Sequence, residues 1–93
     1  MVVAELTIIP LEGAEMRPFV DAAVEVVAES GLKYEVEPMG TCLEGELDQV
    51  LDTVKRAHRA ALDKGTDRLI TEIRIDEDRS ERLSLEHETK GYR

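Results

Sequence analysis

Residues 31–46 read GLKYEVEPMGTCLEGE, and this stretch decides how the chain folds. Gly31 follows a helical pattern and suits the left-handed position that ends a helix. Residues 32–37 alternate between apolar and charged side chains, which predicts a strand. Residues 38–40 then predict a tight turn, and residues 41–44 predict a short strand that leads into a second helix. The stretch therefore predicts a helix end, a hairpin and a helix start in succession.

Two further segments have strand character. Residues 2–11 are rich in β-branched side chains and end near Pro10, and residues 67–76 alternate again. Their apolar faces are Val2, Ala4, Leu6 and Ile8 in the first strand and Leu69, Thr71, Ile73 and Ile75 in the last. Their mixed faces are Val3, Glu5, Thr7 and Ile9 in the first strand and Ile70, Glu72, Arg74 and Asp76 in the last. On the second strand, Leu32, Tyr34 and Val36 point inward and Lys33, Glu35 and Glu37 point outward.

Two segments repeat their apolar residues with the period of a helix. The first runs from about Arg17 to Ser30, with Pro18 in its first turn, where proline is tolerated. The second runs from about Gly45 to Lys64. The predicted buried stripes are Phe19, Ala23, Val26 and Val27, with Val20 and Val24 beside them, and Leu47, Val50, Leu51, Val54, His58, Ala61 and Leu62.

The order strand, helix, strand, strand, helix, strand predicts an α+β fold. This order of elements is the order of a ferredoxin-like βαββαβ sandwich, in which a four-stranded antiparallel sheet has two helices on one face. Residues 1–93 are few enough that we expect a single domain. Residues 80–93 form a polar C-terminal tail whose pattern is compatible with a short helix. The helices leave the other sheet face open, and its apolar residues Val3, Ile9 and Ile70 predict self-association.

Charge and cysteine content restrict the partners of the chain. The formal net charge is −9 at pH 7, so nucleic acid and anionic membrane surfaces are repelled, whereas a cationic small molecule or a metal ion is weakly favoured. The single cysteine, Cys42, excludes an intrachain disulfide and indicates a reducing compartment. The sequence shows no signal-peptide pattern and no apolar run of membrane-spanning length, so we expect a cytoplasmic protein.

No residue set predicts a catalytic or metal centre. The acids at 76–78 are consecutive, and their side chains alternate along a strand and cannot converge on one ion. His58 and His87 have no partner at zinc-ligand spacing, and His58 fits a half-buried, hydrogen-bonded residue. Cys42 has no basic neighbour and fits a small apolar filler better than a nucleophile. Because no glycine-rich phosphate loop occurs either, we expect no cofactor.

Glu44 allows two interpretations. On the third strand its side chain should share the open sheet face with Thr7 and Glu37, as in a small polar binding site. Alternatively, it is an acid beside the positive end of the following helix. Residue chemistry leaves the two interpretations about even, although the second does not explain the neighbouring polar residues.

Several motifs, taken in order, resemble those of a known family. They are Pro10 at the end of the first strand, Ser30-Gly31-Leu32 with Tyr34, Pro38-Met39-Gly40-Thr41 with Glu44-Gly45, His58, Arg68, and Ile75-Asp76 with Arg79. Over nearly its whole length the chain resembles the small thiamine-binding proteins of ferredoxin-like fold (YkoF-like). The Pro-Met-Gly-Thr and Glu-Gly pair is the most specific of these motifs. Residues 12–15 depart from the family pattern, and the tail ends soon after Lys90, which leaves the identity of the ligand open.

The resemblance implies a non-enzymatic protein that binds thiamine or a related pyrimidine or cationic heterocycle, as a carrier or sensor. It also implies homodimers or homotetramers that assemble through their sheets, with ligand near the subunit contacts. By position it assigns Thr41 and Glu44 to the ligand. The open-face argument adds Thr7 and Glu37, and Met39 offers a polarisable platform for a flat ring. A ligand-free regulatory or assembly module is the main alternative, and a small enzyme is a weaker one.

Overall fold

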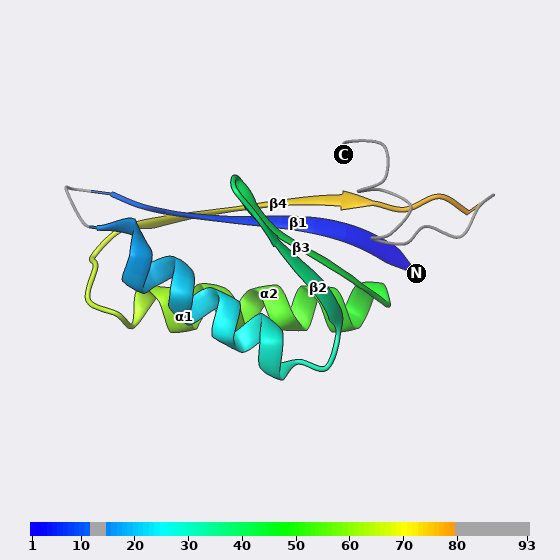
Figure 1. Ribbon diagram of the computed structural model, residues 1–93, viewed down its shortest axis with the longest axis horizontal. Helices are drawn as coiled ribbons and strands as arrows, with labels where there is room; N and C mark the ends of the chain where they lie inside the picture. The colour runs from blue at the N-terminus through cyan, green and yellow to red at the C-terminus, as the bar shows by residue number, and fades with distance from the viewer. Residues whose placement is uncertain (12–14, 80–93) are drawn as a thin grey trace.

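The computed structural model describes residues 1–11 and 15–79. In chain order its elements are β1 (Val2–Pro10), α1 (Met16–Glu29), β2 (Lys33–Glu37), β3 (Gly40–Gly45), α2 (Leu47–Leu62) and β4 (Leu69–Asp76). The strands form one antiparallel sheet in the order β2-β3-β1-β4. Figure 1 shows both helices on the same side of this sheet. The predicted ferredoxin-like α+β fold is confirmed, and the predicted tail helix lies outside the described residues.

β1 lies inside the sheet and carries much of the core. From Val2 to Ile8 its even-numbered side chains point toward the helices and are at most 5% exposed, because successive side chains of a strand alternate between faces. Leu6 lies opposite Ile73 of β4, and Ile8 lies opposite Thr71, so the predicted faces of the first and last strands are confirmed. The helices complete this core with Phe19, Ala23, Val27, Val50, Val54, Ala57 and Ala61.

The buried face of α2 differs from the predicted stripe. Leu47, Leu51 and Leu62 are exposed, whereas Thr53 and Ala57 are buried beside Val50, Val54 and Ala61. α2 packs against α1 and against the sheet, and small side chains at the contact let two elements approach more closely than leucines would. Thr53 is accommodated because its hydroxyl donates to the carbonyl of Gln49 at 2.8 Å.

β2 is an edge strand, and its position explains a second difference. Tyr34 and Val36 point toward the helix side as predicted, because they lie opposite Leu43 and Thr41 of β3. They are nevertheless 40% and 54% exposed, since no strand of the described sheet lies beyond β2. Gly31 has a φ of +81°, as expected for the residue that follows α1. Neither described helix is long and apolar enough to cross a membrane.

Candidate functional site

β1 and β3 differ in length, and the difference leaves part of β1 without a neighbour. Their pairing ends where Leu6 lies opposite Thr41, whereas β1 continues to Pro10. Figure 1 shows the β2–β3 hairpin steeply inclined to β1, with its tip rising past β1 on the side away from the helices. Two-stranded ribbons twist more strongly than wide sheets, which accounts for this divergence. The end of β1 therefore has β4 on one side and open space on the other.

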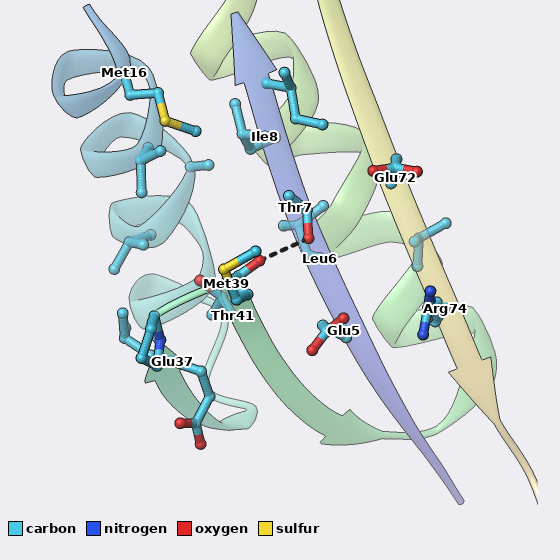
Figure 2. Close-up of a pocket in the computed structure, with 18 residues that line it drawn as sticks. Glu5, Leu6, Thr7, Ile8, Met16, Glu37, Met39, Thr41, Glu72 and Arg74 are labelled. Atoms are coloured by element: carbon cyan, nitrogen blue, oxygen red, sulfur yellow. Dashed lines mark hydrogen bonds between the residues drawn. The ribbon is translucent and has the colours of Figure 1, made fainter.

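The open space is a cavity of about 730 Å³, bounded by α1, β1, the hairpin tip and β4. Figure 2 shows its lining residues. The volume lies in the range that is usual for small-molecule sites. The side of the cavity toward the helices is apolar, with Leu6, Ile8, Val20, Ala23, Val24 and Ile73. A flat organic molecule could therefore bury its ring there.

The side toward the open sheet face is charged. Glu5 of β1, Glu37 of β2, and Glu72 and Arg74 of β4 line it, and three acids against one base give these four residues a net charge of −2. None of the four forms an ion pair within 4 Å with another described residue. A cavity with unpaired charges of mainly one sign attracts ligands of the opposite sign.

Gly40 and Thr7 hold the hairpin tip against β1. The turn contains only two residues, Pro38 and Met39. A Cβ atom on Gly40 would lie 2.8 Å from the carbonyl oxygen of Leu6 and 2.9 Å from Oγ1 of Thr7, so only glycine fits without displacement. The Thr7 hydroxyl donates to the carbonyl of Met39 at 3.1 Å, as Figure 2 shows. The Met39 side chain is 80% exposed and lies on the lining of the cavity.

Thr41 places a hydroxyl on the side of the cavity toward the helices, the inner wall of the cavity. It lies opposite Leu6 of β1 and Val36 of β2, so its side chain belongs to the helix side of the sheet and not to the open face. It is 5% exposed. Its hydroxyl makes no hydrogen bond to any other residue of the described part, and it is accessible from the cavity, because no buried side-chain oxygen of the described residues lacks a partner. A ligand in the cavity could supply that partner.

The cavity brings together four of the five residues that the sequence singled out. Thr7, Glu37, Met39 and Thr41 line it, and Glu44 does not. Glu44 shares the open face with Thr7 as predicted, but it lies opposite Val3 and Lys33. Val3 and Thr7 are four positions apart in β1, which is about 13 Å along an extended strand.

Sequence reasoning missed three charged residues of the cavity, namely Glu5, Glu72 and Arg74. All three belong to the mixed faces that the alternation of the first and last strands predicted. The missing information was that these two strands are neighbours, which brings Glu5 opposite Arg74 and Thr7 opposite Glu72.

Other candidate groups lie outside the cavity. Nδ1 of His58 lies 2.6 Å from the hydroxyl of Thr71, so the predicted half-buried, hydrogen-bonded histidine is confirmed. Cys42 packs against Val3 on the open sheet face. Residues 1–11 and 15–79 contain no group of three His, Cys, Asp or Glu residues that could hold a metal ion. His87 lies outside these ranges.

Comparison with known proteins relates the chain to one family. A family model described as thiamine-binding protein matches residues 4–93. A UPF0045 protein of Methanothermobacter thermautotrophicus is 44% identical over 82 residues, which cover 85% of this chain and 83% of the relative. A UPF0045 protein of Bacillus subtilis is 39% identical over 94 residues, which cover 92% and 88%.

Solved structures show the same fold. A hypothetical protein of Methanocaldococcus jannaschii has a TM-score of 0.88 and 40% identity, over 98% of this chain and 94% of that chain. A proposed thiamine biosynthesis/salvage protein of Thermotoga maritima has a TM-score of 0.85 and 28% identity, over 99% and 98%. The fold and its connections are therefore shared over nearly the full length.

Proposed function

The chain belongs to the thiamine-binding protein family, and from this premise we propose that it binds thiamine or a related aminopyrimidine or cationic heterocycle in the cavity beside β1. In this proposal the protein is a carrier or sensor of that ligand and not an enzyme. The observation that carries the proposal is Thr41. This residue is only 5% exposed, its hydroxyl has no partner within the described chain, and that hydroxyl is accessible on the lining of the cavity. It lies on the inner wall of a cavity whose charged side has a net charge of −2.

The two sides of the cavity suit the two properties of such a ligand. Thiamine has a flat aminopyrimidine ring and a fixed positive charge on its thiazolium ring. The apolar side supports burial of a ring, and the acids Glu5, Glu37 and Glu72 support attraction of a cation. Met39 supports contact with a flat ring, because its thioether is polarisable and adapts to irregular surfaces.

Binding without turnover is supported by the chemistry of the lining. A hydrolytic or transfer reaction needs a nucleophile or base held by a second group. The lining contains carboxylates, hydroxyls and one guanidinium, but His58 and Cys42 lie elsewhere. The description of the matched family, which refers to binding, points the same way.

We further propose that copies of the chain associate through the open sheet face, with ligand held near the contact. Ile9 of β1 and Ile70 of β4 lie opposite each other on this face, and Ile70 is 41% exposed. Burial of exposed apolar groups favours association. Light scattering at micromolar concentration should give at least a dimer mass, and a monomer mass would reject this part of the proposal.

Isothermal titration calorimetry with thiamine tests the binding proposal. The wild-type chain should give a binding isotherm. Thr41→Val removes the hydroxyl and should weaken binding about 5- to 10-fold, as expected for one lost hydrogen bond. Because that hydroxyl has no partner in the free described chain, Thr41→Val should not reduce the free energy of unfolding.

Thr53→Val is the matched control. Thr53 is also buried, but its hydroxyl is bonded to Gln49 and it does not line the cavity, so this change should leave thiamine affinity unaltered. Glu44→Gln decides between the cavity and the open face near Val3. Unchanged affinity favours the cavity, and a loss of affinity favours a site formed at a subunit contact. Heat no different from buffer dilution for the wild type would reject thiamine as the ligand.

The ligand-free assembly module remains the alternative, because the open face and the exposed leucines of α2 offer apolar surface. It predicts an oligomer whose stability does not respond to thiamine. A ligand at a hundredfold excess over its Kd should stabilise the fold by about 2.7 kcal/mol. A thermal-shift measurement therefore separates the two functions.

A further inference from the structure

The backbone groups of β1 point alternately toward β3 and β4. In an antiparallel strand the N–H and C=O of one residue face the same neighbour, and those of the next residue face the other. The N–H of Leu11 donates to the carbonyl of Arg68, which continues the β4 side, so odd-numbered residues face β4. The carbonyl oxygen of Leu6 lies 2.8 Å from the position of a Cβ on Gly40, so even-numbered residues face β3.

Ile8 is the next even-numbered residue, and β3 does not reach it. The next bond of the ladder would run from the N–H of Ile8 to the carbonyl of Met39. That bond is not formed, since the pairing of β1 with β3 ends at Leu6 and Thr41. The Met39 carbonyl accepts the Thr7 hydroxyl, which lies on the open-face side of β1. Pro10, which follows on the same side, has no N–H.

Ile8 therefore turns one N–H and one C=O toward the cavity. Ile8 lines the cavity and is only 5% exposed. In the described chain, neither of its peptide groups has a hydrogen bond on the β3 side. A shielded peptide group without a hydrogen-bond partner costs free energy. A ligand that bonds to both groups would remove this cost, and the difference would add to its affinity.

We propose that the N–H and C=O of Ile8 recognise the donor–acceptor edge of a 4-aminopyrimidine. The amino group of the ligand donates to the Ile8 carbonyl, and the adjacent ring nitrogen accepts the Ile8 N–H. This inference rests on the proposed function and specifies which part of the ligand enters first. The ring takes the place of the missing residue of β3, between the apolar side of the cavity and the charged side.

Thr7 is a positioning residue in this arrangement. Its hydroxyl donates to the Met39 carbonyl at 3.1 Å and so holds that carbonyl toward the open sheet face, away from the N–H of Ile8. The effect is one of position, since a carbonyl oxygen can accept two hydrogen bonds. Without the hydroxyl, the Met39 carbonyl can accept the N–H of Ile8, and that N–H is then no longer available to the ligand. Thr7 thus acts through Met39 and Ile8 and need not touch the ligand.

Amide hydrogen exchange measured by NMR on the full chain tests the proposal. In the free protein the Ile8 amide should exchange at least about tenfold faster than the Leu6 amide, which lies within the paired ladder. Thiamine and the fragment 4-amino-2-methylpyrimidine should both slow exchange at Ile8. The matched lactam, 2-methyl-4-pyrimidinone, reverses the donor and the acceptor and should not slow it.

Two variants test the role of Thr7. In Thr7→Val the free protein should show slow exchange at Ile8 and about tenfold weaker thiamine binding. Thr7→Ser keeps a hydroxyl and should restore fast exchange at Ile8. Fast exchange at Ile8 together with unchanged affinity in Thr7→Val would overturn the positioning role.

The outcomes separate this inference from the proposed function. If calorimetry detects thiamine binding but exchange at Ile8 does not change, the inference is overturned and the function stands. If thiamine does not bind but the aminopyrimidine fragment slows exchange at Ile8, the inference is supported and thiamine is rejected. If neither compound binds, both fail.

Discussion

Replacing Gly40 with alanine should destabilise the protein by driving the hairpin tip away from β1. The new Cβ would lie 2.8 Å from the carbonyl oxygen of Leu6 and 2.9 Å from Oγ1 of Thr7. The first of these atoms is backbone, so it cannot rotate away, and the strands must separate. The movement also strains the hydrogen bond from Thr7 to Met39.

The expected loss of unfolding free energy is about 2 kcal/mol. Forcing an extra methyl group into a filled site costs about 1–3 kcal/mol, and a lost hydrogen bond costs about 1 kcal/mol. Alanine offsets part of this, because it restricts the unfolded chain by about 0.4–1 kcal/mol relative to glycine. For a domain of this size a loss of about 2 kcal/mol lowers the Tm by roughly 8–16 °C.

Urea unfolding followed by far-UV circular dichroism, at one fixed protein concentration, measures this loss. Gly31→Ala is the matched control, because Gly31 has a φ of +81° but no atom within 4 Å of its Cβ position. It should cost stability through backbone strain alone and leave thiamine affinity of the folded protein unchanged. Gly40→Ala should reduce both. A Gly40→Ala protein within about 0.5 kcal/mol of the wild type would refute the close contact between the hairpin and β1.

Two further predictions concern the core and the half-buried pair of His58 and Thr71. Leu43→Ala should cost about 2–5 kcal/mol, because Leu43 is fully buried, whereas Leu51→Ala on the exposed side of α2 should change stability by less than about 1 kcal/mol; equal losses in urea unfolding would contradict the observed orientation of α2. Thr71→Val removes the partner of His58 Nδ1 at 2.6 Å and should cost about 1–3 kcal/mol. Thr71→Ser should recover most of that in the same measurement, and a neutral Thr71→Val would show that the bond adds no stability.

Strand faces could be predicted from the sequence, whereas the buried face of α2 could not. A strand has a period of two, so one apolar residue fixes the direction of all the others. On a helix the apolar stripe is broad, and α2 offers two overlapping ones. Leu47, Leu51 and Leu62 belong to one, and Ala57 and Ala61 belong to the other. Packing against α1 and the sheet selects the alanines, and that choice depends on contacts that the segment does not contain.

The sequence predicts on which face of the sheet the candidate residues lie, but not where along the strands they come together. Alternation correctly puts Glu44, Thr7 and Glu37 on the open sheet face. The register of β3 against β1 decides that Glu44 lies beside Val3 and far from Thr7. The cavity itself arises because β1 extends beyond the end of β3. The inner wall of the cavity, with Thr41, is accessible because the hairpin diverges from β1, and the sequence did not predict that divergence.

The two-residue turn at Pro38 and Met39 has a consequence for how such a protein can be retuned. Because the hairpin stops just past Leu6, its reach sets how much of β1 stays bare. Inserting a pair of residues at the turn would advance the ribbon by one rung and shrink the hollow, and deleting a pair would enlarge it. The volume available to a ligand thus depends on the length of a surface loop, and changes in that length leave the aliphatic interior untouched.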